Sequence, residues 1–468
     1  MNNATIARIG TLFAALFAIL IVRQLYVQVV AGPRLAAKPY NPRHALLGQH
    51  RGRILASDGT VLAQSLKGKR AYPLGASLAQ TVGYVSPRYG TSGIEDAYDR
   101  SLSPPDTTGD VLSQFEDLGA ALTGKTLDVR GADVVTTIDP AIQASLFGEL
   151  SAHARAAGVV LDPRTGAILA IASVPSFDPN ALANEFPSLN HDERSPLLNR
   201  ALDGLYPPGS TFKIFTAASA LDSGSVTMAS TFDDPGYLVI GNFTLHDDES
   251  EATGVQDLTG AFALSSNVDF GQIALKMGTD TFYNYLDRWG IGAPLDLQLP
   301  ASRDRVPAKA GIVPGELAQM GFGQGALLMT PLHMALITAT IADGGSEPRP
   351  FIVREIVRAG IPASSFSSAT LASPISADTA ANVKKMMVAV VAHGTGTSAQ
   401  IPGVTVAGKT GTATNPVGAA HSWFVAFAPA ENPRIAVAIV VENAGYGAAV
   451  AAPIARNVLR VALQSVRS

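Results

Sequence analysis

The sequence contains no cysteine among its 468 residues. This absence excludes thiol catalysis, disulfide bonds and cysteine-bound metal ions. It is compatible with an oxidising extracytoplasmic space but does not by itself indicate a location. The sequence also lacks a strong excess of charge of either sign. Its 34 Lys and Arg nearly balance its 38 Asp and Glu, and the formal net charge is -4. No strongly basic patch favours nucleic-acid binding.

Long apolar runs are scarce too, and the informative one lies near the N-terminus. Residues 9–22 carry no charge and lie between Arg8 and Arg23. As a helix they would span ~21 Å, whereas continuation to residue 30 would reach ~33 Å, enough for a hydrocarbon core of about 30 Å. We predict an uncleaved transmembrane anchor over residues 1–32, with an interfacial or partner-facing second part. The alternative is a secretory signal peptide, but the residues after the apolar run form a poor cleavage site.

Residues 33–130 are predicted to form a small membrane-proximal module. Within it, two short strands are expected on either side of an Asp58-Gly59 turn. A second domain is predicted over residues 131–468. Asp139 and Pro140 provide the N-cap and first position of a helix that should run to about residue 157.

Strand and helix patterns are segregated along the second domain. A hairpin is expected around residues 162–166, followed by mostly helical patterning from Ser210 to about residue 340. Strands are expected again at residues 405–408, 422–428 and 435–442, and a last helix at 453–466. This order predicts an α/β (α+β) fold, in which a mixed sheet carries a helical insert.

One turn carries the first chemical signal. Pro207, Pro208 and Gly209 break the preceding structure, and Ser210 should lie in the first turn of the next helix, with Lys213 on the same face. A hydroxyl nucleophile needs a base, and burial favours the neutral amine of a lysine. Backbone N–H groups at a helix start also face a developing oxyanion. Taken alone, Ser-x-x-Lys is a weak signal, and a Ser cap beside a solvated lysine is the better interpretation of a lone match.

Two further motifs change this interpretation. Ser265-Ser266-Asn267 follows a helical pattern at residues 258–264, and Lys409-Thr410-Gly411-Thr412 follows an apolar stretch. The three motifs occur in the order that is typical of penicillin-recognising serine enzymes. The middle motif matches as S-x-N rather than as S-D-N.

With these motifs, the chain resembles class B penicillin-binding proteins, the monofunctional D,D-transpeptidases of bacterial cell-wall synthesis. The resemblance covers nearly the whole chain. It implies a penicillin-recognising serine transpeptidase fold, with an antiparallel sheet flanked by helices and an all-helical subdomain. The short membrane-proximal module is similar to that of compact actinobacterial members. The segments that carry the resemblance are Arg51-Gly52-x-Ile54, residues 137–140, 161–166, 206–213, 323–325 with 330–331, and 408–412.

The resemblance implies a role for each catalytic residue. Ser210 would attack the carbonyl between the two D-Ala residues of a stem peptide, and Lys213 would take its proton. Ser265 would pass a proton to the departing D-Ala nitrogen, and Asn267 would hydrogen-bond the substrate and Lys213. Lys409 would face the terminal carboxylate of the substrate.

The remaining motif residues are expected to bind substrate. The Thr410 and Thr412 hydroxyl groups would bind the carboxylate, and Gly411 would let the substrate approach the strand edge closely. Backbone N–H groups of Ser210 and Thr412 would form the oxyanion hole. No metal ion or organic cofactor is expected.

The resemblance also implies partners and a location. The expected ligands are peptidoglycan stem peptides on lipid II-derived glycan strands, and β-lactam antibiotics. The expected protein partner is a membrane glycosyltransferase of the shape, elongation, division and sporulation family. The protein would be single-pass in the bacterial cytoplasmic membrane, with its catalytic domain outside. No interaction with nucleic acid is expected.

Three alternatives stay open at this point. A serine β-lactamase or a D,D-carboxypeptidase would use water as the acceptor, but the predicted anchor and module argue against both. A non-catalytic scaffold of the wall machinery would not need the complete set of motifs.

The acidic segment His246-Asp247-Asp248-Glu249 is interpreted as an exposed loop rather than a metal site. The sequence does not distinguish elongation, division and sporulation.

Overall fold

The computed structural model describes residues 3–26, 50–104, 130–247 and 252–466. Helix α1 (Asn3–Leu25) exposes large apolar side chains that include Leu12, Phe13 and Phe17. In the ranges that the structure describes, no helix is both long enough and apolar enough to cross a membrane. Residues 27–32 of the predicted anchor lie outside the described ranges, as do residues 33–49 and 105–129 of the predicted membrane-proximal module.

A mixed six-stranded sheet contains the first strands of the chain. Its order is β15-β14-β6-β1-β2-β3, and β1 and β2 are antiparallel around the Asp58-Gly59 turn, as the sequence predicts. Strands from before residue 130 therefore share a sheet with strands from after it, and the boundary at 130 stays a prediction. The six strands are β1 (Ile54–Leu55), β2 (Val61–Leu66), β3 (Lys69–Ala71), β6 (Asp133–Thr136), β14 (Val353–Arg358) and β15 (Ile361–Ser365).

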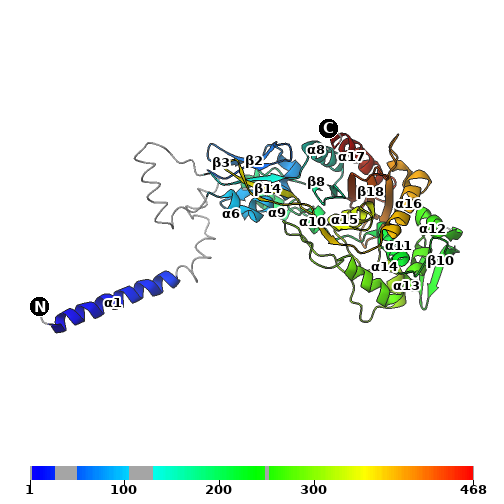
Figure 1. Cartoon of the computed structure of the whole chain (residues 1–468), viewed down its shortest axis with the longest axis horizontal. Helices are drawn as coiled ribbons and strands as arrows, with labels where there is room; N and C mark the ends of the chain where they lie inside the picture. The colour runs from blue at the N-terminus through cyan, green and yellow to red at the C-terminus, as the bar shows by residue number, and fades with distance from the viewer. Residues whose placement is uncertain (1–2, 27–49, 105–129, 248–251, 467–468) are drawn as a thin grey trace.

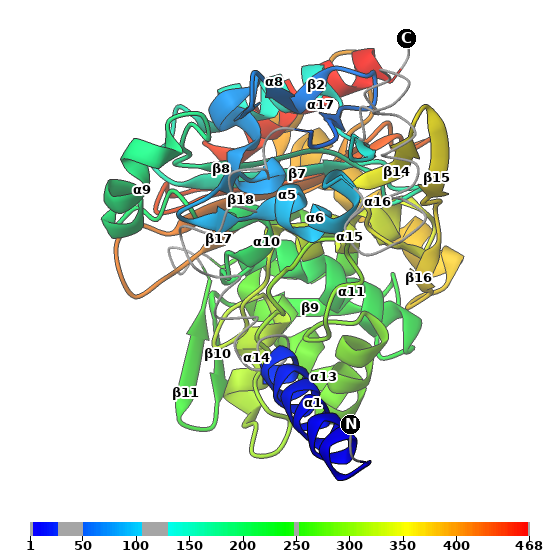
Figure 2. The same cartoon turned by 90° about the vertical axis from the view of Figure 1, so that its left-hand side faces the viewer.

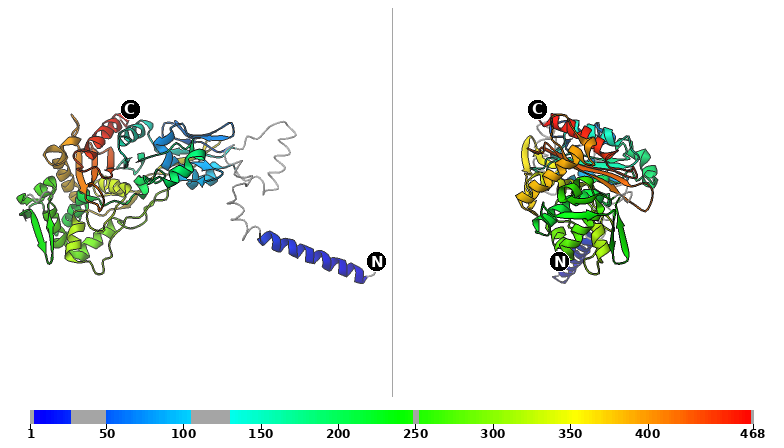
Figure 3. Two further views of the ribbon diagram at one scale, coloured as in Figure 1. Left: turned by 180° about the vertical axis from the view of Figure 1, so that it is seen from behind. Right: turned by 90° about the vertical axis from the view of Figure 1, so that its right-hand side faces the viewer.

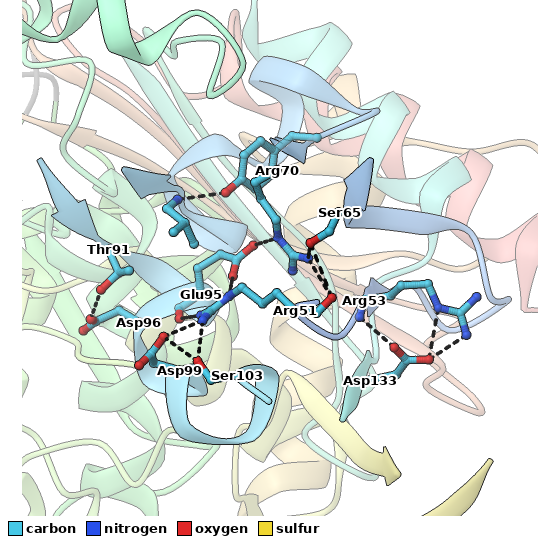
Figure 4. A network of polar contacts seen from close by, with 12 residues as sticks. Arg51, Arg53, Ser65, Arg70, Thr91, Glu95, Asp96, Asp99, Ser103 and Asp133 are labelled. Atoms are coloured by element: carbon cyan, nitrogen blue, oxygen red, sulfur yellow. Dashed lines mark hydrogen bonds and ion pairs between the residues drawn. The ribbon is translucent and has the colours of Figure 1, made fainter. Parts of the chain in front are cut away.

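A buried ion-pair network holds this N-terminal region together (Figure 4). Arg51 is fully buried and donates to Glu95 at 2.7 Å and to Asp99 at 2.5 Å. Arg70 donates to the second oxygen of Glu95 at 2.6 Å. A Cβ on Gly52 would lie 1.9 Å from the carbonyl oxygen of Ala132, so only glycine fits beside this network.

The core of the larger part of the chain is a five-stranded antiparallel sheet in the order β17-β18-β19-β7-β8. Helices α8 (Pro140–Leu150) and α17 (Ala451–Ser465) cover one face, and α15 (Pro331–Ala342) and α16 (Ala377–His393) cover the other (Figure 2). The edge strand β17 thus has one side free of sheet pairing. The strands are β17 (Ala407–Ala413), β18 (His421–Ala428), β19 (Ile435–Val441), β7 (Ala156–Leu161) and β8 (Ile168–Val174).

Most predicted elements of this layer are confirmed, and two boundaries were wrong. Asp139 caps α8 by accepting from the backbone N–H groups of Ala141 and Ile142. The helix ends at Leu150 rather than near residue 157, because Ala156–Leu161 is fully buried and pairs on both sides within the sheet. The strand expected at residues 405–408 lies at Ala407–Ala413 and includes the Lys-Thr-Gly-Thr motif.

A helical insert lies at the end of the molecule away from the six-stranded sheet (Figures 1 and 3). Its elements near the motifs are a 3-10 turn, η3 (Gly209–Phe212), and helices α11 (Lys213–Asp222), α12 (Leu258–Leu264), α13 (Asn267–Arg288) and α14 (Pro314–Gly321). The predicted helical patterning missed two antiparallel pairs within the insert. They are β9 (Thr231–Asp234) with β12 (Gly254–Asp257), and β10 (Tyr237–Ile240) with β11 (Phe243–His246). Their segments are only four residues long, too short for a clear periodic signal.

Candidate active site

Ser210 lies in the 3-10 turn that precedes α11, rather than in the first turn of an α-helix. The turn is fixed from both sides. The backbone N–H of Gly209 donates to the carbonyl of Gly323 at 2.8 Å, and the indole N–H of Trp423 on β18 donates to the carbonyl of Pro207 at 3.1 Å. Ser210 is therefore held where the helical insert meets the sheet.

Lys213 is fully buried at the start of α11. Its Nζ donates to the Asn267 Oδ1 at 2.9 Å, to the Ser265 hydroxyl at 3.3 Å and to the Ser265 carbonyl. Burial disfavours an ammonium ion, and a hydrogen bond to a hydroxyl gives a proton a route out of the site. The structure thus brings the first and second sequence motifs into direct contact.

The S-x-N motif is the junction of two helices. Ser265 has a left-handed backbone conformation (φ 67°) at the end of α12, and α13 begins at Asn267. The Lys409 Nζ donates to the Ser265 hydroxyl at 2.8 Å. The Ser265 hydroxyl consequently lies between two lysine amines, one from α11 and one from β17, which is the geometry of a proton relay.

The Lys-Thr-Gly-Thr motif lies on the edge strand β17. The Thr410 hydroxyl pairs with that of Thr395 at 2.6 Å, which fixes its orientation toward the cleft. A Cβ on Gly411 would lie 2.9 Å from side-chain carbons of both Thr211 and Trp423. The glycine is thus required by packing of the Ser210 turn against the strand, a reason that differs from the close substrate approach expected from the sequence.

A cavity of about 320 Å³ joins these elements. Ser210, Ser265, Thr410 and Thr412 line it, while Lys213, Asn267 and Lys409 reach its lining through the hydrogen bonds above. Gly411 lies between Thr410 and Thr412 on β17, so the eight residues predicted for the site converge on one place. The cavity is also lined by Asp247, Thr253, Leu264, Ser266, Thr395, Tyr446 and Ala448, which the sequence did not assign to it.

Asp247 corrects one interpretation from the sequence. The sequence predicts that it belongs to an exposed acidic loop, but its side chain is half-buried and accepts from the backbone N–H groups of Asn267 and Val268, the latter at 3.3 Å. Its position after an apolar strand and before the S-x-N motif gave no signal of this contact. Asp248 and Glu249 lie outside the described ranges. Within those ranges, no group of three or more His, Cys, Asp or Glu side chains is arranged to hold a metal ion.

Two family models match the chain. The "Penicillin binding protein transpeptidase domain" matches residues 156–460, and the "Penicillin binding protein A dimerisation domain" matches residues 51–134. The chain is 35% identical to the "Peptidoglycan D,D-transpeptidase PbpA" of Mycobacterium tuberculosis, over 99% of each chain.

Solved structures agree with these matches. The D,D-transpeptidase domain of a peptidoglycan glycosyltransferase from Eggerthella lenta superimposes with a TM-score of 0.81 at 36% identity, over 90% of this chain and 99% of that chain. Penicillin-binding protein A from M. tuberculosis, as its ceftriaxone acyl-enzyme complex, gives a TM-score of 0.82 at 32% identity, over 90% of this chain and 100% of that chain. The mixed α/β transpeptidase fold predicted from the sequence is confirmed. The chain belongs to the class B penicillin-binding proteins, a family of serine D,D-transpeptidases.

Proposed function

We propose that this protein cross-links peptidoglycan stem peptides through an acyl-enzyme on Ser210, and that β-lactams acylate the same hydroxyl. The observation that carries the proposal is the double hydrogen bond to the Ser265 hydroxyl, from Lys409 at 2.8 Å and Lys213 at 3.3 Å, beside the cavity that Ser210 lines. A proton that Lys213 takes from Ser210 would then have a path through the Ser265 hydroxyl to the leaving group. Curated relatives named peptidoglycan D,D-transpeptidases support the same reaction.

In the acylation step, the Ser210 oxygen forms a bond to the carbonyl carbon of the penultimate D-Ala, and its proton passes to neutral Lys213. Backbone N–H groups of Ser210 and Thr412 stabilise the oxyanion. The C–N bond to the terminal D-Ala then breaks, and Ser265 delivers the proton to the departing nitrogen. Lys409 holds the terminal carboxylate by its charge, together with the Thr410 and Thr412 hydroxyl groups.

In the transfer step, an amine of a second stem peptide attacks the ester carbonyl and loses its proton to Lys213. The bond from the carbonyl carbon to the Ser210 oxygen then breaks, and Lys213 returns the proton to that oxygen. Hydrolysis in place of this transfer would need a general base for water in the lining of the cavity. Asp247 is the one carboxylate that lines it among the described residues, and its oxygens already accept from α13 and Ser266. A general base poised over a water, as a β-lactamase requires, is therefore not provided by the described lining.

Product analysis tests the reaction. The full-length protein is incubated with a pentapeptide donor, with and without an acceptor carrying a free amine. A cross-linked peptide formed at the expense of hydrolysed donor is expected. Hydrolysis that is unaffected by acceptor would indicate a carboxypeptidase, and rapid turnover of penicillin would indicate a β-lactamase. A folded protein that forms neither product nor penicillin adduct would indicate a scaffold.

We further propose that residues 1–32 attach the protein to the bacterial cytoplasmic membrane, with the catalytic domain outside. The proposal is supported by the exposed apolar side chains of α1, such as Leu16 and Leu20. A membrane glycosyltransferase of the shape, elongation, division and sporulation family is the proposed partner. The protein should remain with membranes after a high-salt wash, because salt screens charge but does not weaken apolar burial. Deletion of residues 1–32 should release it, and free wild-type protein with a new N-terminus would favour a signal peptide.

A further inference from the structure

Three aspartates gather behind the S-x-N motif, and the mechanism above does not use them. They are Asp234 at the end of β9, Asp247 after β11 and Asp269 in the first turn of α13. Asp234 and Asp269 are fully buried, and Asp247 lines the active-site cavity. They come from three separate elements of the helical insert, so their proximity is created by the fold.

Asp247 connects this cluster to the proposed active site. It accepts hydrogen bonds from the first backbone N–H groups of α13, those of Asn267 and Val268, and from the Ser266 hydroxyl at 3.3 Å. Asn267 in turn accepts from the Lys213 amine at 2.9 Å. A carboxylate on the N-terminus of a helix stabilises it by charge as well as by hydrogen bonding. Asp247 therefore fixes the start of the helix that presents Asn267 to Lys213.

The cluster cannot carry three full negative charges without cost. Asp234 and Asp247 are joined through Gly236, whose N–H donates to the Asp234 carboxylate at 2.7 Å and whose carbonyl accepts from the Asp247 N–H at 3.3 Å. A direct hydrogen bond between the two carboxyl groups would need a proton between them. Asp234 also accepts from the Thr253 hydroxyl at 2.7 Å. Neither carboxylate oxygen of Asp269 has a hydrogen-bond partner, so its ionised form would be a buried and unpaired charge.

The charged neighbours of the cluster are few. The charged groups with the largest effects on Asp247 and Asp269 are the cluster members themselves and Lys213 from α11. Lys213 also faces Lys409 of β17 across the Ser265 hydroxyl, and that positive charge favours the neutral amine of Lys213.

Burial, followed by the hydrogen bond to Asp234, raises the pKa of Asp247 to about 6. Burial, followed by the charges of Asp234 and Asp247, raises the pKa of Asp269 to about 7. Hydrogen bonds outweigh burial at Asp234 and lower its pKa, so this member stays ionised.

We propose that Asp247 is a positioning residue for Asn267, and that Asp234, Asp247 and Asp269 form a proton-sharing cluster whose charge acts on Lys213. Each proton that leaves the cluster adds a negative charge, which favours the ammonium form of Lys213 by Coulomb attraction. Lys213 serves as a base in its neutral form, so the cluster limits acylation as the pH rises. The inference rests on the proposed roles of Lys213 and Asn267.

Acylation of the full-length protein by a fluorescent penicillin tests both parts. The second-order rate constant is measured from pH 5 to pH 8 for wild type, Asp247→Ala, Asp247→Asn and Asp269→Asn. Asp233→Asn is the matched control, since Asp233 is the exposed neighbour of Asp234 on the same strand. Loss of the acceptor in Asp247→Ala should lower the rate constant by about tenfold or more at both pH values. Asp247→Asn keeps an acceptor oxygen and should recover most of that loss at pH 5.

The effect of the cluster's charge on Lys213 is measured by comparing the acylation rate constants of each variant and the wild type at two pH values. For Asp247→Asn and Asp269→Asn, the ratio of variant to wild-type rate constants should be higher at pH 8 than at pH 5 by about threefold to tenfold, because removing one negative charge favours the neutral amine of Lys213. Asp233→Asn should give the same ratio at both pH values. If the ratio is independent of pH in both Asp247→Asn and Asp269→Asn, the proton-sharing proposal is wrong. This test does not need Asp247→Ala to fold.

A folded Asp247→Ala that acylates like Asp233→Asn would overturn the positioning role. These failures are distinguishable from failure of the proposed function. If Ser210→Ala still labels, the reaction itself has been assigned wrongly. If labelling depends on Ser210 while the aspartate variants behave like the control, only the cluster inference is lost.

Discussion

Replacing Arg51 by methionine should destabilise the N-terminal region far more than the same change at Arg53. The two arginines are two positions apart, and each pairs with an acidic side chain (Figure 4). They differ in burial, since the Arg51 side chain is 0% exposed and that of Arg53 is 44% exposed. The comparison therefore isolates the effect of burying an ion pair.

The expected loss in the free energy of unfolding follows from the polar groups that lose their partner when Arg51 is replaced. Its guanidinium donates to the Glu95 carboxylate, the Glu95 carbonyl, Asp99 and the Ser103 hydroxyl. Breaking a buried pair by removing one partner costs ~3–5 kcal/mol, and we expect about 3 kcal/mol because Arg70 still pairs with Glu95. The exposed pair of Arg53 with Asp133 should contribute at most about 1 kcal/mol.

Urea unfolding of the full-length protein, followed by circular dichroism, measures both losses, with penicillin labelling in the absence of urea as a test of the active site. Arg51→Met should lower the free energy of unfolding by about 3 kcal/mol relative to wild type, and Arg53→Met by less than about 1 kcal/mol. Both variants should label normally. Equal losses for the two variants would refute the reasoning from burial.

Three further predictions concern the active site and the core. Lys409→Ala should slow acylation by substrates that bear a carboxylate more than by neutral esters, and equal losses would show that Lys409 is not a carboxylate site. The penicillin adduct should persist through many normal turnover times, which mass spectrometry after removal of free drug will measure; loss within seconds would favour a β-lactamase. At His333, burial is the largest influence and lowers the pKa, but the charge of Asp304 and its hydrogen bond, together with the charge of Glu347, outweigh burial and raise the pKa to about 9. The resulting stability is complete below an unfolded pKa near 6.5 and is lost as the pH rises through 9. The free energy of unfolding should thus fall by about 1 kcal/mol between pH 8 and 9.5 through this group, and His333→Gln should abolish that fall. An unchanged pH dependence in His333→Gln would contradict the assignment.

Local signals in the sequence predicted local structure well. The Asp139-Pro140 start of α8 and the hairpin around residues 162–166 are confirmed, because a capping side chain and a tight turn act over a few residues. The active-site residues were predicted because short motifs carry them. Their convergence on one cavity depends on packing between α11, the α12–α13 junction and β17, which no local pattern encodes.

The missed features are the ones that depend on distant partners. Strand β14 pairs with β6 across more than 200 positions of sequence, and no periodicity indicates that pairing. Asp247 looked like a member of an exposed acidic run until the fold placed it on the first N–H groups of α13. Gly411 was predicted to matter, but the side chains of Thr211 and Trp423 that require a glycine there come from other elements.

The most direct test of the account is to locate the penicillin adduct on the chain. The full-length protein is acylated, digested and mapped by mass spectrometry, alongside a Ser210→Ala variant with an unchanged thermal transition. The account predicts a single adduct on the peptide that contains Ser210, and none on the variant. An adduct on another residue, or normal labelling of folded Ser210→Ala, would contradict it.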